Sequence, residues 1–134
     1  MEISPKFIWF FSQAILIALA IAGAEKRLRN YKKIFIIGIT TFLVGLTGLM
    51  IRSSDTALPR GNAADFLFSP FIFVITHVLL RQLYKRVYHA EPTYVWLRSY
   101  DYEEFRKVNI WDKVVHVLPL ILGMFLPFLG MLFE

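Results

Sequence analysis

The chain has 134 residues, of which 57% are hydrophobic and 19% charged, and its mean hydropathy is +0.54. Soluble chains are usually about half apolar, so this composition argues against a soluble domain and predicts an integral membrane protein. The net charge of +5 comes without a groove-reading or base-stacking motif, which argues against nucleic-acid binding, and the absence of cysteine excludes disulfides and cysteine catalysis.

Four apolar stretches are each long enough to cross about 30 Å of hydrocarbon as a helix. In chain order, the predicted helices cover about residues 5–28, 33–52, 63–88 and 110–133. We therefore predict an all-α fold: a single four-transmembrane-helix bundle over residues 1–134, with an interfacial connection at 89–109. The first stretch has the length of a signal peptide, but the basic residues after it favour a retained helix.

Polar residues and prolines mark the ends and bends of these helices. Ser4 is expected to cap the first helix, and Pro5 suits the first helical position. Two later starts are typical of capping boxes with Asp in place of Glu: Asn62 with Asp65, and Asn109 with Asp112. Three prolines inside the spans are expected to bend them: Pro70, Pro119 and Pro127.

The distribution of Lys and Arg predicts the orientation. Of the 15 basic residues, five lie in 25–33 and seven in 81–113, and only Lys6, Arg52 and Arg60 lie elsewhere. Basic loops stay on the cytoplasmic side, so both termini are expected on the outer side, most simply in a bacterial inner membrane. All six tyrosines fall on the expected cytoplasmic side, as interfacial tyrosines do.

The segment 81–113 is the expected cytoplasmic interface. Its first part, 81–88, continues the third helix, and Asp101 is expected to start another short helix that reaches Lys107. Aromatic and basic side chains favour contact with a partner protein or with anionic lipid. The residues expected to make this contact are Arg81, Tyr84, Lys85, Tyr88, Trp96, Arg98 and Trp111.

Small residues recur at helical spacing on three of the four predicted helices. They let helix backbones approach closely, either inside the bundle or against a partner. The predicted packing residues are Ala14, Ala18 and Ala22 on the first helix, Gly38, Thr41, Gly45 and Gly48 on the second, and Gly123 and Gly130 on the fourth.

Two histidines are the sharpest candidate for chemistry. His77 precedes Arg81 by four residues and His116 follows Lys113 by three, so both lie within about 6 Å of the expected inner boundary. Two imidazoles at matching depth suit a b-type haem, with Arg81 or Lys85 near the propionates, and also a quinone headgroup or a metal ion. The alternative is a pair of interfacial histidines that hydrogen-bond to a hydroxyl or a carbonyl.

No catalytic set accompanies these residues, and no Asp, Glu, Lys or Arg lies at an expected membrane centre. The sequence therefore favours a non-enzymatic accessory or assembly subunit that binds membrane lipid and a membrane-protein partner or further copies of itself. No cofactor or metal is expected for that role, and no nucleic acid. Two alternatives stay open: a haem- or quinone-binding redox subunit using His77 and His116, and a small oligomeric channel or transporter.

Overall fold

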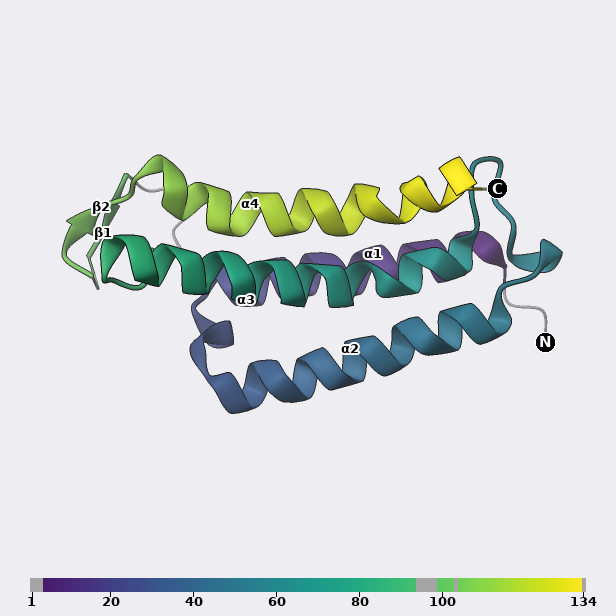
Figure 1. Cartoon of the computed structure of the whole chain (residues 1–134), viewed down its shortest axis with the longest axis horizontal. Coiled ribbons are helices and arrows are strands. Elements are labelled where there is room, and N and C mark those ends of the chain that lie inside the picture. Colours follow the sequence, from purple (N-terminus) through teal and green to yellow (C-terminus); the bar gives the residue numbers. More distant parts are fainter. Residues whose placement is uncertain (1–3, 94–98, 103, 134) are drawn as a thin grey trace.

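A computed structural model describes residues 4–93, 99–102 and 104–133 of the chain. Among these residues, four helical spans are long and apolar enough to cross a membrane, and Figure 1 shows them side by side along one axis. The elements in order are α1 (Pro5–Ala24), η1 (Arg27–Arg29), α2 (Tyr31–Ile51), η2 (Ser54–Thr56), η3 (Ala63–Phe68), α3 (Ser69–Tyr88), β1 (Tyr100–Asp101), β2 (Arg106–Lys107), α4 (Ile110–Phe125) and η4 (Leu126–Phe133).

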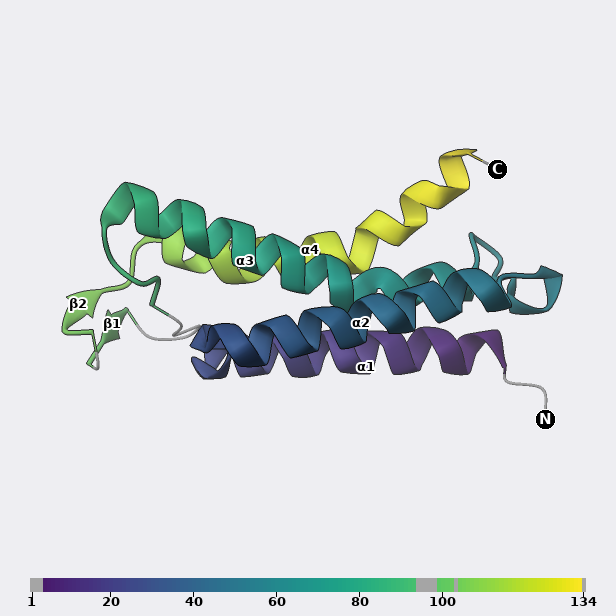
Figure 2. The ribbon, with the colours of Figure 1, turned by 60° about the horizontal axis from the view of Figure 1, so that its bottom comes forward.

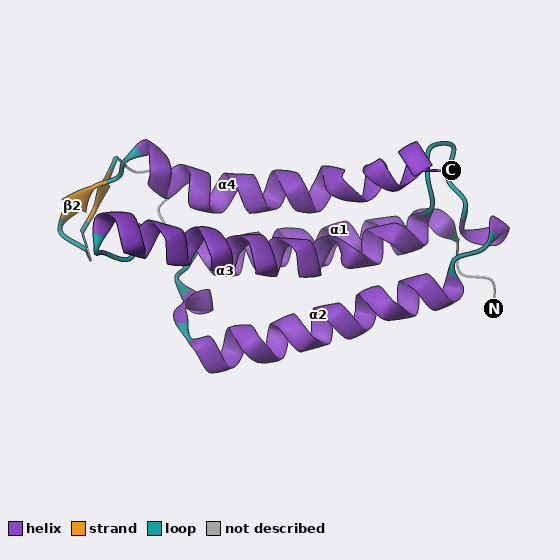
Figure 3. Ribbon diagram, in the orientation of Figure 1, coloured by secondary structure: helices purple, strands orange, loops and turns teal. Residues whose placement is uncertain are grey.

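The buried core lies where α1, α3 and α4 meet. Leu16 of α1 and Phe73 of α3 are fully buried there, together with Pro119 of α4. The fourth long helix, α2, packs against η3 and α3 and diverges from α3 towards η1 (Figures 1 and 3). Large apolar side chains such as Phe35 and Met50 are exposed on the outer faces, as lipid-facing side chains are.

The helix starts follow the predicted capping patterns in part. At α4 the capping box is confirmed, because the Asn109 side chain accepts from the Asp112 amide and the Asp112 side chain accepts from the Asn109 amide. Asn62 accepts from the Ala64 amide, but it starts the 3₁₀ helix η3 rather than an α-helix. Ser4 makes no side-chain cap bond, so that expectation is wrong, and Pro5 alone marks the start of α1.

The predicted short helix from Asp101 to Lys107 is wrong. Within the described residues this stretch forms an antiparallel hairpin, in which Tyr100 pairs with Lys107 and Asp101 with Arg106. The Asp101 carboxylate accepts from the Glu104 amide, and Phe105 has a φ of 51°, in the left-handed region. A residue in that region closes a turn and interrupts a right-handed helix, so the backbone pairs across the turn.

The prolines act differently from one another. Pro70 lies in the first turn of α3, where proline is tolerated, and Pro119 lies inside α4. Near Pro127 the α-helix ends at Phe125 and continues as the 3₁₀ helix η4, and Figure 2 shows this end bending away from the other helices. Proline has no N–H to bond back along the helix, which accounts for the change of geometry there.

Candidate functional site

The two predicted histidines meet at the centre of the three-helix contact. His77 of α3 is fully buried and His116 of α4 nearly so, and their ring centroids lie 5.8 Å apart with the planes tilted by 38°. His77 also stacks on Phe73, at 5.7 Å and 5° between the ring planes. The sequence predicted a pairing of these residues from their matching depth on helices expected to be neighbours, and whether they bind a ligand stays a prediction.

A third helix, which sequence reasoning missed, closes this site. A Cβ built on Gly23 of α1 would lie 3.8 Å from His77 Cε1 and 3.9 Å from His116 Nδ1. The backbone of α1 therefore passes next to both imidazoles, and a Cβ at this position would make only ordinary van der Waals contacts with them. In the sequence, this position is a single glycine near the end of the first helix. The regular spacing of the alanines pointed to a different face of that helix as the packing face.

The packing around the imidazoles limits which ligand they hold. Phe73 covers one face of His77, α1 lies against both rings, and neither ring reaches the surface. A tetrapyrrole would fit between the two imidazoles only if α1 moved away from them. A metal ion or a quinone ring is smaller and needs a smaller displacement of α1. Within the described residues, no group of three or more His, Asp or Glu side chains gathers to bind a metal ion.

One turn along α3 from His77, a buried ion pair joins three segments of the chain. The Arg81 guanidinium donates to both carboxylate oxygens of Glu91, at 2.8 and 2.7 Å, and to the carbonyl of Arg29 at 3.1 Å. Lys85 donates to the same carboxylate at 2.9 Å. Hydrogen bonds from Arg81 and Lys85 lower the pKa of Glu91 from 4.5 to about 2, although partial burial opposes this shift.

Arg81 is therefore not available for haem propionates or for a docking surface, the roles that the sequence suggested. A two-pronged guanidinium–carboxylate contact in a nearly buried place fixes geometry more than it adds stability, because both ions lose their water. Here the contact holds the end of η1, the helix α3 and the connection after α3 in one arrangement.

A second buried carboxylate organises the start of α4. Asp112 is fully buried and accepts from the Thr93 amide at 2.7 Å and from the Asn109 amide at 2.8 Å. The Arg106 guanidinium donates to both of its oxygens, at 2.8 and 3.1 Å, and to the Tyr84 hydroxyl at 2.9 Å. The sequence identified Asp112 only as a cap; its ion pair with Arg106 depends on the hairpin, which was not predicted.

Two further ion pairs attach the hairpin to the first loop. Lys26 lies 3.1 Å from the Asp101 carboxylate, and Arg29 donates to Glu104 at 2.7 Å. These partners are 75 residues apart in sequence. Together with Asp112 and Glu91, they form a charged network at one end of the bundle, which we call the hairpin end.

The predicted interface residues divide into four groups. Arg81 and Tyr84 are buried inside the chain, so the expectation that they form a surface is wrong. Tyr88 and Trp111 are exposed, and they line a groove of about 310 Å³ between α3 and α4 that Tyr84 also borders. Lys85 is half-buried against Glu91, while Trp96 and Arg98 lie outside the described residues.

The small residues also differ in where they lie. On α2, Gly45 and Gly48 are buried against η3, and a Cβ on Gly48 would lie 2.5 Å from the Ala64 carbonyl oxygen. On α4, a Cβ on Gly123 would lie 2.8 Å from the Leu16 side chain. Of the other predicted packing residues, Thr41 of α2 is buried and Gly38 of α2 faces Val74. Gly130 lies in η4, which follows α4.

Two of the three predicted packing alanines of α1, Ala14 and Ala18, do not lie in the bundle. Ala14 and Ala18 are exposed and Ala22 is half-buried, whereas Ser12, Leu16, Ala20 and Gly23 form the buried face of this helix. Packing through Ala14 and Ala18 therefore needs a second chain or lipid. The buried face was missed because Ser12 and Gln13 are polar; Ser12 donates to the Phe66 carbonyl and so satisfies its hydroxyl inside the contact.

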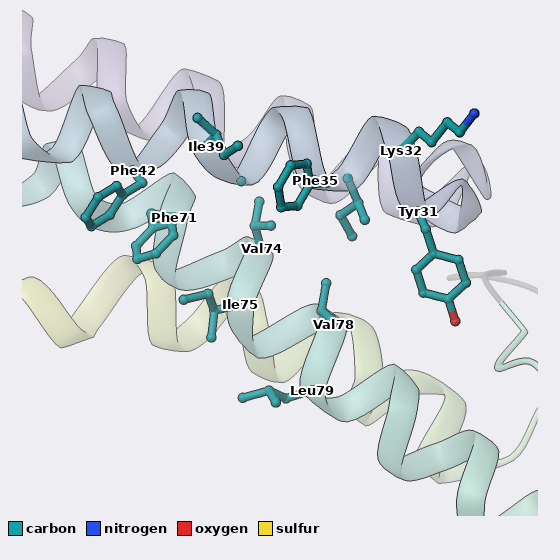
Figure 4. A pocket seen from close by; sticks show the side chains of 12 residues that line it. Tyr31, Lys32, Phe35, Ile39, Phe42, Phe71, Val74, Ile75, Val78 and Leu79 are labelled. Atoms are coloured by element: carbon teal, nitrogen blue, oxygen red, sulfur yellow. The ribbon is translucent and has the colours of Figure 1, made fainter.

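A long apolar groove separates α2 from α3. It has a volume of about 830 Å³, and side chains of both helices line it, among them Phe35, Phe42, Phe71 and Val78. Figure 4 shows Tyr31 and Lys32 at one end of the groove, with the Tyr31 phenol and the Lys32 ammonium pointing in opposite directions, and apolar side chains along the rest. No sequence pattern indicates this groove, because it results from the angle between two helices.

Comparison with known proteins identifies no relative for this arrangement. No family model, no curated protein and no solved structure matches the chain. The functional interpretation therefore rests on the residues and their geometry.

Proposed function

We propose that the chain is a non-enzymatic membrane subunit that docks a membrane-protein partner through its hairpin. The observation that carries this proposal is the exposure of two aromatic residues at the turn: Tyr102 is 69% and Phe105 82% exposed. The hairpin of β1 and β2 that carries them lies beyond the ends of the long helices (Figure 1), where hydrocarbon does not cover it. Exposed aromatic side chains at a fixed position are typical of protein interfaces.

The charged network supports the proposal because it holds the hairpin in place. Lys26–Asp101, Arg29–Glu104 and Arg106–Asp112 attach it to the first loop and to α4. A partner that meets a surface already ordered in this way loses less conformational entropy on binding. Phe105 also has a positive φ, which costs about 1 kcal/mol for a residue with a side chain and is consistent with a functional turn.

We place the hairpin end on the cytoplasmic side, with both termini outside, most simply in a bacterial inner membrane. The support is the concentration of Lys and Arg in the first and third loops. An accessory or assembly role fits this orientation, since the hairpin then faces the compartment in which subunits are made.

Site-specific crosslinking tests the docking proposal, since the chain has no cysteine of its own. We expect Phe105→Cys, crosslinked in native membranes, to give one adduct of defined mass. Ser54→Cys, which is exposed at the opposite end, is the control and gives none. The adduct's mass distinguishes a different partner from a second copy of the chain. If Phe105→Cys gives no adduct and the protein purifies alone in mild detergent, the proposal fails.

A redox role is the second candidate, supported by the 5.8 Å separation of His77 and His116. In this version the two imidazoles hold a b-type haem or a quinone, after α1 has moved at Gly23 to admit it. An absorption spectrum of the purified protein is the test. A Soret band that both His77→Ala and His116→Ala abolish supports the haem version, and a spectrum without the band removes it.

A further inference from the structure

We propose that the groove between α2 and α3 binds one anionic phospholipid, with an acyl chain along the groove and the phosphate at the end where α2 begins. This is a second site on the chain, separate from the hairpin. It depends on the shape of the groove, on its length and on the charges at its open end.

The groove is open at one end and closed at the other. At the closed end the Phe42 and Phe71 rings touch, with their centroids 5.0 Å apart, and beyond them Gly45 lies against Phe68. At the open end Tyr31 and Phe35 are large and exposed, and α2 has diverged from α3 (Figures 1 and 4). The wider end of the groove therefore lies beside η1.

The length of the groove fits one leaflet. From Tyr31 to Phe42 there are 11 residues along α2, which gives about 16 Å at 1.5 Å per residue. That is about half of the 30 Å hydrocarbon core. A partner helix that crosses the membrane would need a matching face across both leaflets, whereas an acyl chain needs only this half. The volume of about 830 Å³ lies in the range for a single bound ligand.

The charges at the open end favour an anionic headgroup. Lys32 is exposed there, and both the Arg81 guanidinium and the Lys85 ammonium lie over the Tyr31 ring, at 5.1 and 5.9 Å from its centroid. Glu91 neutralises only one of these last two cations. The end of the groove therefore keeps an excess of positive charge, and the field of that charge favours an anionic headgroup.

Two adjacent lysines provide a matched test of the headgroup contact. Lys32 lines the groove, whereas Lys33 is exposed and does not line it. The Asn30 side chain caps α2 through the backbone amides of both lysines, so Gln at either position leaves the cap intact. Removing one cation from an anionic-lipid contact costs about fivefold in affinity.

The experiment is native mass spectrometry of the full chain with equal amounts of dioleoyl phosphatidylglycerol and dioleoyl phosphatidylcholine. We expect the wild-type protein to retain one phosphatidylglycerol in preference to phosphatidylcholine. Lys32→Gln should lower that preference about fivefold, and Lys33→Gln less than twofold. An equal loss in both variants would indicate a general surface potential and overturn the proposal, as would equal retention of the two lipids by the wild type.

A second pair of variants tests the groove itself. Gly38 lines the groove, and a Cβ there meets Val74 at an ordinary 3.7 Å, so Gly38→Phe places its ring in the groove without a backbone clash. Leu43→Phe adds a ring on an exposed part of α2 outside the groove. We expect only Gly38→Phe to lose the retained lipid. Retention by that variant would exclude the groove as the site, and Lys32→Gln still tests the headgroup if Gly38→Phe does not fold.

Discussion

At the level of single residues, two carboxylates, one buried and one half-buried, determine how the loops join the helices. Asp112 accepts from two backbone amides and from Arg106, and Glu91 accepts from Arg81 and Lys85. Asp112 was recognisable in the sequence as a cap, because capping is local. Its ion pair was not recognisable, because it depends on where the hairpin folds. Glu91 gave no sequence signal, since its partners lie 6 and 10 residues away across the end of a helix.

Glu91 makes the stability of the chain depend on pH. Its pKa is about 2 in the folded chain against an ordinary 4.5, so the stabilisation is fully present above pH 4.5 and is lost as the pH falls towards 2. We expect the free energy of unfolding in detergent to fall by on the order of 3 kcal/mol across that range. Chemical unfolding of the wild type and of Glu91→Gln at several pH values isolates this contribution.

The control for this measurement is Glu25→Gln, because Glu25 pairs with Arg27 at the exposed end of α1. The free energy of unfolding of Glu25→Gln should depend on pH in the same way as that of the wild type. If Glu91→Gln loses as much stability on acidification as the wild type does, another carboxylate is responsible. The Arg81–Glu91 contact then contributes less to stability than proposed.

At the level of elements, the four long helices followed from apolar length, and their packing followed only in part. Gly45, Gly48 and Gly123 lie at close contacts, as small residues in membrane helices do, but Ala14 and Ala18 lie outside the bundle. Spacing puts residues on one face of a helix without telling which face is buried. The hairpin was missed for a similar reason, since its register depends on Lys26 and Arg29 from a distant loop.

The contact between α2 and η3 gives a prediction at this level. We expect Gly48→Ala to destabilise the bundle by about 1–3 kcal/mol, because its Cβ would lie 2.5 Å from a backbone oxygen that cannot rotate away. Gly38→Ala is the matched control on the same helix, where the new Cβ meets only Val74 at 3.7 Å. It should be neutral or stabilising by up to about 1 kcal/mol, since Ala favours a helix over Gly.

Thermal unfolding of both variants in the same detergent is the measurement. Equal stability of Gly48→Ala and Gly38→Ala would show that α2 and η3 separate readily, and that the close approach contributes little to the bundle.

At the level of the whole molecule, the distribution of charge predicts the orientation in the membrane. In the structure, the first loop and the hairpin lie at the same end of the bundle, where Lys26 contacts Asp101. We expect a membrane-impermeant maleimide to label Lys33→Cys and Lys107→Cys from one side, and Ser54→Cys from the other. All three positions are exposed, and the native chain contributes no thiol to the signal.

Labelling of positions 33 and 107 from opposite sides would be incompatible with the Lys26–Asp101 and Arg29–Glu104 contacts. The bundle and both proposed sites would then need revision together.

The sequence by itself determined the apolar composition expected of a membrane protein and the presence of four helical spans long enough to cross a membrane. These properties depend on apolar length and on the rise per residue, which are local. Only the tertiary structure decided that Gly23 closes the histidine site, that the loop charges pair with one another, and that α2 opens a groove beside α3. Those features depend on the angles and rotations between helices, and contacts distant in sequence determine them.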